Sequence, residues 1–180
     1  AFAGAAFICG LISAKDIAAH QIALSMASFT FNLCVGFSVA STVMIGRKLG
    51  EKDFVNLEKV GFNNLKIAFI FMLMCGLVFI LGKDVLPTFF TKKEDIAVVE
   101  LASQLMIIAA LFQLSDGIQV TALGCLRGIQ DVKIPSILTF IAYWVITIPL
   151  GYYLTVPMKM GAFGMWIALG IGLTISAVLL

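Results

Sequence analysis

The chain has few charged residues and a single histidine. Only 12% of its 180 residues are Asp, Glu, Lys or Arg, whereas a soluble domain carries about 25%. Hydrophobic residues make up 61%, more than a soluble core of this chain length can bury. The net charge of +2 comes with no basic cluster, which argues against nucleic acid as a partner. We therefore expect a protein that contacts membrane lipid.

The residue sets of common enzymes are also missing. No His/Asp/Ser constellation is apparent around the single histidine, and no glycine-rich phosphate loop of the P-loop type occurs. The four cysteines lie in apolar runs without a CxxC pair, so we expect small packing residues rather than a zinc site or a disulfide framework. We expect neither catalysis nor an organic cofactor.

Long apolar runs dominate what remains. Six of them are separated by five polar breaks, and the first, residues 1–14, is too short to span a membrane. The other five are each about membrane length, since roughly 20 residues cross a bilayer core. Backbone groups in lipid must be paired within their own segment, and no alternating barrel pattern is present, so an all-α transmembrane helix bundle is predicted. The five runs are residues 17–45, 60–81, 96–126, 134–156 and 161–180.

The two ends of the chain lack the features of natural termini. The chain starts with Ala, has no basic segment before its first apolar run, and stops inside an apolar run. We therefore expect one transmembrane domain, residues 1–180, with its first and last helices truncated.

The polar breaks carry the chemistry of helix ends. GRKLGEKD, residues 46–53, has two glycines that can end a helix, and Asp53 can cap the next one. TKKEDI, residues 91–96, predicts another capped start. RGIQDVKIP, residues 127–135, is a third break, and Pro157 lies in a short turn, TVPMKMG, residues 155–161.

The basic residues predict an orientation. If the spans cross in sequence, alternate breaks share a side, and one side holds both arginines and the larger basic count. The positive-inside rule places that side, with GRKLGEKD and RGIQDVKIP, in the cytoplasm. This side holds Arg47, Lys48, Lys52, Lys59, Lys66, Arg127 and Lys133, and the other holds Lys15, Lys83, Lys92, Lys93 and Lys159.

Asp116 is the only acid inside the apolar stretch at residues 105–126. A carboxyl near the middle of a membrane helix is costly unless it is neutralised or paired, so such acids are typical of ion or proton sites in transporters. Gln113 and Gln119, three residues to either side, share a helix face with it. We expect this face, with Ser115 and Thr121 nearby, to line a cavity for a cation or proton. The alternative is a hydrogen-bond network that holds helices together.

Further polar residues have two interpretations each. Gln21 is a candidate substrate contact, and His20 either relays protons or simply lies near the membrane boundary. Gly117 and Gly124 let their helix bend or let neighbours approach closely, and we favour packing.

Arg127 lies at the end of the same helix as Asp116. The two are eleven residues apart, roughly 16 Å along a helix, too far for a direct pair. We expect Arg127 to anchor the helix end, with Asp131 in the same loop as its partner.

Taken in order, six segments of the chain resemble the multidrug and toxic compound extrusion (MATE) family of antiporters. Each is weak alone, but together they cover nearly the whole chain with family-like spacing. They are AAHQIAL (18–24), GRKLGEKD (46–53), QLSDGIQV (113–120), LGCLRGIQD (123–131), YWVITIPLGY (143–152) and GAFGMWIALGIGL (161–173).

The resemblance implies a fold and a set of roles. The family has twelve helices in two six-helix lobes around a central cavity, and this chain corresponds to most of the C-terminal lobe, from late in the seventh helix onward. Asp116 matches an acid implicated in cation or proton coupling, and Gln21 lies near the position of a cavity glutamine. Phe112 departs from the Tyr that many members have there, which weakens a sodium assignment. The acid expected in the seventh helix would lie before Ala1.

The resemblance also implies a function. We expect one half of a multi-pass secondary multidrug antiporter of the bacterial inner membrane, which exports cationic small molecules against an inward proton or sodium ion. Sodium, if used, is expected at Asp116. The N-terminal lobe of the same full-length protein is the expected partner. One alternative is a lipid-linked saccharide flippase of a related family, which would need basic residues in its cavity. A structural membrane subunit is another, although a buried acid argues against it.

Overall fold

The computed structural model describes residues 2–10, 13–90 and 96–180, and every element in these ranges is helical. Five helical segments are long and apolar enough to cross a membrane: α2, α3, α4, the rod formed by α5, η2 and α6, and α7. The predicted all-α transmembrane helix bundle is therefore confirmed. In order, the elements are α1 (Phe2–Gly10), α2 (Ala14–Gly50), α3 (Phe54–Gly82), the 3-10 turn η1 (Leu86–Phe89), α4 (Ile96–Gly128), α5 (Lys133–Phe140), the π-helix η2 (Ile141–Thr147), α6 (Ile148–Thr155) and α7 (Gly161–Leu179).

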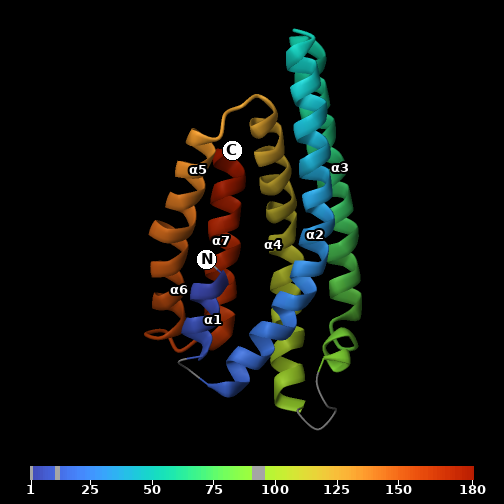
Figure 1. Ribbon diagram of the computed structural model, residues 1–180. Helices are drawn as coiled ribbons and strands as arrows, with labels where there is room; N and C mark the ends of the chain where they lie inside the picture. The colour runs from blue at the N-terminus through green and yellow to red at the C-terminus, as the bar shows by residue number, and fades with distance from the viewer. Residues whose placement is uncertain (1, 11–12, 91–95) are drawn as a thin grey trace.

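The helices run up and down, so that alternate turns lie at the same end of the bundle (Figure 1). The α2–α3 and α4–α5 turns lie at one end, and the start of α2 and the α6–α7 turn lie at the other. Lys92 and Lys93 fall outside the described residues. The turns that carry most of the remaining basic residues lie at the ends that the sequence predicted. Lys66 is an exception, because it lies in the middle of α3 rather than at its start. The side that faces the cytoplasm stays a prediction.

α4 is the central helix of the bundle (Figure 1). It packs against α2, α3 and α7, whereas the α5–η2–α6 rod lies on the far side of α7. Position in the bundle follows composition, because α4 presents small and polar side chains over most of its length. The large apolar side chains of the other helices point outward, as in a bundle surrounded by lipid: Leu81 is 84% exposed and Phe29 is 68% exposed.

Side-chain caps begin two of the long helices. Ser13 accepts a hydrogen bond from the Asp16 backbone N–H at 3.0 Å, and Asp53 accepts one from the Asn56 N–H at 3.3 Å. The predicted cap at Asp53 is confirmed. The capped start predicted in TKKEDI lies outside the described residues, apart from Ile96.

The end of α2 was expected to depend on glycine, and this was wrong. α2 and α4 both end in a six-to-one hydrogen bond, from Asp53 N–H to the Lys48 carbonyl and from Asp131 N–H to the Leu126 carbonyl, each 3.0 Å long. This is the Schellman arrangement, which places one residue in the left-handed region. That residue is Lys52 (φ 56°) in one turn and Gln130 (φ 65°) in the other.

The run at residues 134–156 was expected to be an ordinary helix, but it contains a π-helical segment. Pro149 follows this segment, and a proline both lacks the backbone N–H that would bond to the fourth residue before it and crowds that residue's carbonyl. The helix widens just before the proline, where the Thr147 hydroxyl donates to the Ala142 carbonyl at 2.8 Å. The segment places Tyr143 against α4 and Thr147 against Gly172 of α7.

The cysteines behave as packing residues, as expected. All four are free thiols; Cys9 and Cys34 are fully buried and Cys75 and Cys125 are partly buried.

Candidate functional site

Asp116 lies in the second half of α4 with only 7% of its surface exposed. It lines a cavity of about 300 Å³ between α2 and α4. Apart from Ser28, the remaining lining is apolar, and no lysine or arginine takes part. The other lining residues are Leu24, Ala27, Phe31 and Phe112.

The Asp116 carboxyl group has no polar partner within residues 2–10, 13–90 and 96–180: neither a hydrogen bond nor an ion pair reaches it there. A carboxylate in apolar surroundings is destabilised until a proton or a cation neutralises it. The arrangement therefore suits a group that binds and releases a positive charge at the wall of a cavity.

Gln113 is buried next to Asp116 but is bound to α2. Its Oε1 accepts a hydrogen bond from the Thr30 hydroxyl at 3.1 Å, and only 1% of the residue is exposed. Its Nε2 group is buried without a hydrogen-bond partner in the described part of the chain. One half of the amide thus fastens α4 to α2, and the other half is left for a ligand or for a further contact.

Gln119 is hydrogen-bonded to the π-helical segment η2 rather than to α2. Its Oε1 accepts a hydrogen bond from the Tyr143 hydroxyl at 2.7 Å, which links α4 to the π-helical segment. Ser115 similarly shares a hydrogen bond of 3.0 Å with Thr174 of α7. Gln113, Asp116 and Gln119 of the predicted polar face are therefore buried, whereas Ser115 is half-buried. Among these residues, only Asp116 lines the cavity. The interhelical network that was the alternative interpretation is present.

Gln21 lies apart from this group. Its side chain is exposed on α2, on the helix stripe that continues through Leu24, Ser28 and Phe31 at the wall of the Asp116 cavity. Gln21 thus lies one helical turn before the cavity wall along α2, and its side chain is exposed at the surface of this lobe. Its role as a substrate contact stays a prediction.

The glycines of α4 serve close packing, as favoured from the sequence. A Cβ added at Gly124 would lie 2.3 Å from the Ser38 backbone oxygen of α2, and one added at Gly117 would lie 2.5 Å from Met72 Cγ of α3. At this seam Ser38 donates to the Val120 carbonyl at 2.7 Å and Thr42 donates to the Gly124 carbonyl at 2.8 Å. The small residues let the backbones approach, and the hydroxyls then join them.

His20 is part of the core. It is fully buried, and its Nδ1 accepts a hydrogen bond from Trp166 Nε1 of α7 at 3.1 Å. The Trp166 ring packs in turn against Phe112, with ring centroids 5.2 Å apart. Phe112, where the family resemblance led us to expect a tyrosine, is therefore a packing residue and a wall of the Asp116 cavity.

Arg127 and Asp131 do not form the expected pair. Arg127 is exposed in the last turn of α4, and no ion pair joins the two side chains within the described residues. The Schellman turn explains this, because the left-handed residue Gln130 reverses the chain between them.

No group of three or more His, Cys, Asp or Glu side chains that could hold a metal ion occurs within the residues searched. A sodium ion at Asp116 would have to take its other ligands from hydroxyl, amide or backbone oxygens. Sodium at Asp116 stays a prediction.

Known proteins resemble this chain in sequence. A family model described as MatE matches residues 2–153. The probable multidrug resistance protein NorM of Xylella fastidiosa (strain 9a5c) is 39% identical over 173 residues, which is 96% of this chain and 36% of that protein. The probable multidrug resistance protein NorM of Agrobacterium fabrum (strain C58) is 38% identical over 182 residues, covering 99% of this chain and 39% of that protein. The chain therefore spans less than two fifths of the length of these curated relatives.

Solved structures share the fold. The crystal structure of the eukaryotic MATE transporter AtDTX14 superposes with a TM-score of 0.92 at 19% identity, over 99% of this chain and 40% of that one. A structure of MATE in the bent conformation gives a TM-score of 0.84 at 16% identity, over 99% and 39%.

These matches agree with the arrangement of the spans. The names of the matched proteins are those of transporters and multidrug resistance proteins rather than of enzymes. With a family model that covers most of its length and five helical segments able to span a bilayer, this chain belongs to the MatE family of multi-pass membrane proteins.

Proposed function

We propose that this chain is the C-terminal lobe of a multidrug efflux antiporter that expels organic cations in exchange for a proton or a sodium ion. The observation that carries the proposal is Asp116, a buried carboxyl without a polar partner in the described chain, at the wall of an apolar cavity. A carboxyl in such a place is stable only when something positive joins it.

Competition for this one negative charge is sufficient for exchange. If an inward ion and a cationic drug both neutralise Asp116, each lowers the affinity of the protein for the other by the same factor. The apolar walls, including Phe31 and Phe112, suit the hydrophobic body of an organic cation. Because no Lys or Arg lines the cavity, it does not favour the pyrophosphate of a lipid-linked saccharide.

The relatives support the same assignment. Two are named probable multidrug resistance proteins, and both are more than twice as long as this chain. We infer that an N-terminal lobe of the same protein supplies the other half of a central cavity, and that the protein lies in the inner membrane of a bacterium with the α2–α3 turn in the cytoplasm. Substrate binding at mid-membrane depth and rocking of one lobe against the other then give alternating access.

The test is the substitution Asp116→Asn in the full-length protein. The amide keeps the size of the side chain and removes the charge, so dye efflux from intact cells should be abolished while the amount of membrane-inserted protein stays close to normal. Asp84→Asn is the matched control, because Asp84 is exposed beyond the end of α3. Normal efflux by Asp116→Asn at equal expression would reduce Asp116 to a packing residue.

The coupling ion is tested in liposomes that contain the purified protein. An outward drug movement driven by an imposed pH gradient without sodium would assign the proton, and one that requires a sodium gradient at constant pH would assign sodium. Drug movement driven by neither gradient would contradict antiport.

A further inference from the structure

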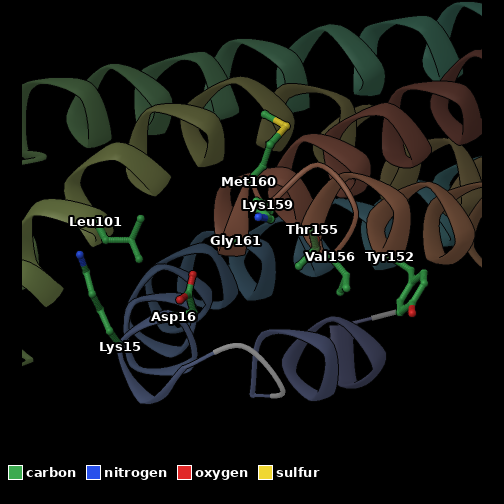
Figure 2. A pocket seen from close by; sticks show the side chains of 9 residues that line it. All are labelled: Lys15, Asp16, Leu101, Tyr152, Thr155, Val156, Lys159, Met160 and Gly161. Atoms are coloured by element: carbon green, nitrogen blue, oxygen red, sulfur yellow. The ribbon is translucent and has the colours of Figure 1, made fainter.

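A larger pocket, of about 610 Å³, lies at the end of the bundle where α2 begins and where α6 turns into α7 (Figure 2). It shares no residue with the Asp116 cavity. Its walls come from the first turn of α2, the first turns of α4 and the α6–α7 turn. The lining residues are Lys15, Asp16, Leu101, Tyr152, Thr155, Val156, Lys159, Met160 and Gly161.

Three charged side chains line this pocket: Asp16, Lys15 and Lys159. The acid is hydrogen-bonded, whereas the two lysines are not paired with an acid in the described part of the chain. The Asp16 carboxylate is engaged, since its Oδ1 accepts a hydrogen bond from the Ala162 backbone N–H at 2.8 Å and its Oδ2 is bonded by the Ser13 hydroxyl. Asp16 thereby caps the first turn of α7. Lys15 and Lys159 are both exposed, and neither forms an ion pair within the part of the chain that the structure describes.

Thr155 lines the pocket from the end of α6 and is 2% exposed, but its Oγ1 atom is itself buried and therefore does not face the pocket. The polar groups that the pocket offers to a ligand are therefore those of Lys15 and Lys159.

The rest of the lining is apolar and lies at the level where helices end. Leu101, Val156 and Met160 contribute alkyl surface, and Tyr152 presents an aromatic ring with a hydroxyl tip. Tyrosine and lysine at the ends of membrane helices are typical of the interface between headgroups and acyl chains. A ligand that combines an anionic oxygen group with an apolar body matches this lining.

We propose that this pocket binds a phosphate-bearing anion, with Lys15 and Lys159 holding its charge. The apolar rim favours the headgroup of an anionic phospholipid over free phosphate as the source. The site lies at the bundle end opposite the α2–α3 turn, so it is separate from the proposed ion and drug site and does not depend on its function.

The experiment is lysine footprinting of the full-length protein in lipid nanodiscs. The rate at which an amine-reactive ester acylates each lysine is measured by mass spectrometry in discs of phosphatidylcholine alone and in discs that also contain phosphatidylglycerol. Lys83, beyond the end of α3 at the same end of the bundle, serves as the internal reference and cancels the effect of surface potential. The anionic lipid is expected to slow acylation of Lys15 and Lys159 about fivefold relative to Lys83.

Variants identify the pocket as the cause. Lys159→Gln should abolish the selective protection of Lys15, whereas Lys133→Gln, a change at the opposite end of the bundle, should leave it unchanged. Equal acylation of Lys15, relative to Lys83, in both kinds of disc would overturn the proposal, and so would full protection of Lys15 in Lys159→Gln.

A second arm distinguishes the two sources of phosphate. Inorganic phosphate at millimolar concentration is added to the phosphatidylcholine discs. Protection only by phosphatidylglycerol would assign a lipid headgroup, and equal protection by inorganic phosphate would assign a soluble phosphate compound. Protection by neither would refute the anion site.

Discussion

α3 and α4 are both long apolar helices of the same bundle, but they bury very different numbers of residues. α3 is the more apolar of the two, yet only four of its residues are buried, whereas fourteen residues of α4 are buried. Seven of the fourteen are glycine or alanine, and four are Gln113, Asp116, Gln119 and Thr121. In lipid, large apolar side chains gain little by leaving the surface, so small and polar residues decide which helix becomes central.

The largest expected effect comes from filling the α2–α4 seam. Gly124→Ala would place its Cβ 2.3 Å from the Ser38 backbone oxygen, so a backbone must move. We expect a loss of about 3 kcal/mol in stability, the upper part of the usual range for overpacking. The matched control is Gly36→Ala on α2, where no atom lies within 4 Å of the new Cβ. The measurement is the temperature at which the folded protein is lost from size-exclusion profiles in detergent. Equal melting of both variants would mean that the seam is not tightly packed.

A pair of methionines tests the contrast between α4 and α3 directly. Met106 on α4 is fully buried and Met74 on α3 is 63% exposed. Met106→Ala leaves a cavity in the core and should cost about 2 kcal/mol, at the low end of the usual range because lipid rather than water is the alternative surroundings. Met74→Ala should change stability by less than about 0.5 kcal/mol. A larger loss for Met74→Ala than for Met106→Ala would contradict the assignment of α3 as an outer helix.

The polar links of α4 are expected to contribute less than its packing. Tyr143→Phe removes the hydroxyl that donates to Gln119, and Thr30→Val removes the one that donates to Gln113. Hydrogen bonds between membrane helices contribute about 0.6 kcal/mol on average, so each variant should lose roughly that amount. Tyr153→Phe is the control, since Tyr153 is exposed. The same melting assay applies, and a loss in Tyr153→Phe as large as that in Tyr143→Phe would count against a role for the Gln119 bond.

The smallest expected effect on stability comes from the α2–α3 turn, where charged side chains rather than close packing hold the structure. Hydrogen bonds from the Asn56 side chain and from Lys48 hold the pKa of Asp53 below its usual value. A lowered carboxyl pKa contributes stability at pH values above the usual value of about 3.9, and this contribution is lost as the pH falls through the pKa of the folded state. Asp53→Asn should therefore melt slightly below the wild type near pH 6, and the difference should be smaller at about pH 3, below the usual carboxyl pKa.

Glu58→Gln is the control for this prediction, since Glu58 is an exposed acid on the same helix. Its difference from the wild type should vary less between the two pH values than that of Asp53→Asn. A constant difference between Asp53→Asn and the wild type over this range would show that the charge of Asp53 is not involved.

The sequence predicted the spans well but the helix ends poorly. Five apolar runs gave five helical segments, because the length of a bilayer crossing is set by the lipid and not by neighbouring helices. The left-handed residues that end α2 and α4 are a lysine and a glutamine, for which sequence gives no strong signal. The π-helical segment was missed as well, although Pro149 marks its place.

The candidate site was predicted in part. Asp116 was predicted because an acid inside an apolar run is unfavourable in lipid unless it is neutralised or paired. The structure buries it beside a cavity. That Thr30 and Tyr143 would bind the neighbouring glutamines could not be predicted, because they lie 83 and 24 residues away along the chain. The expected pair of Arg127 and Asp131 was wrong for a related reason, since closeness in sequence does not fix the direction of a turn.

The sequence by itself determined that this protein lies in a lipid bilayer, how many spans it has and that they alternate in direction. It also identified one acid, Asp116, whose charge is unfavourable in lipid. Each of these depends on the composition of a single segment and the properties of lipid. Only the tertiary structure decided that α4 is central, that Gln113 and Gln119 are held by other helices, and that Lys15, Thr155 and Lys159 meet in one pocket. These outcomes depend on which faces pack together, and small residues such as Gly124 specify that only when the surface of the partner helix is known.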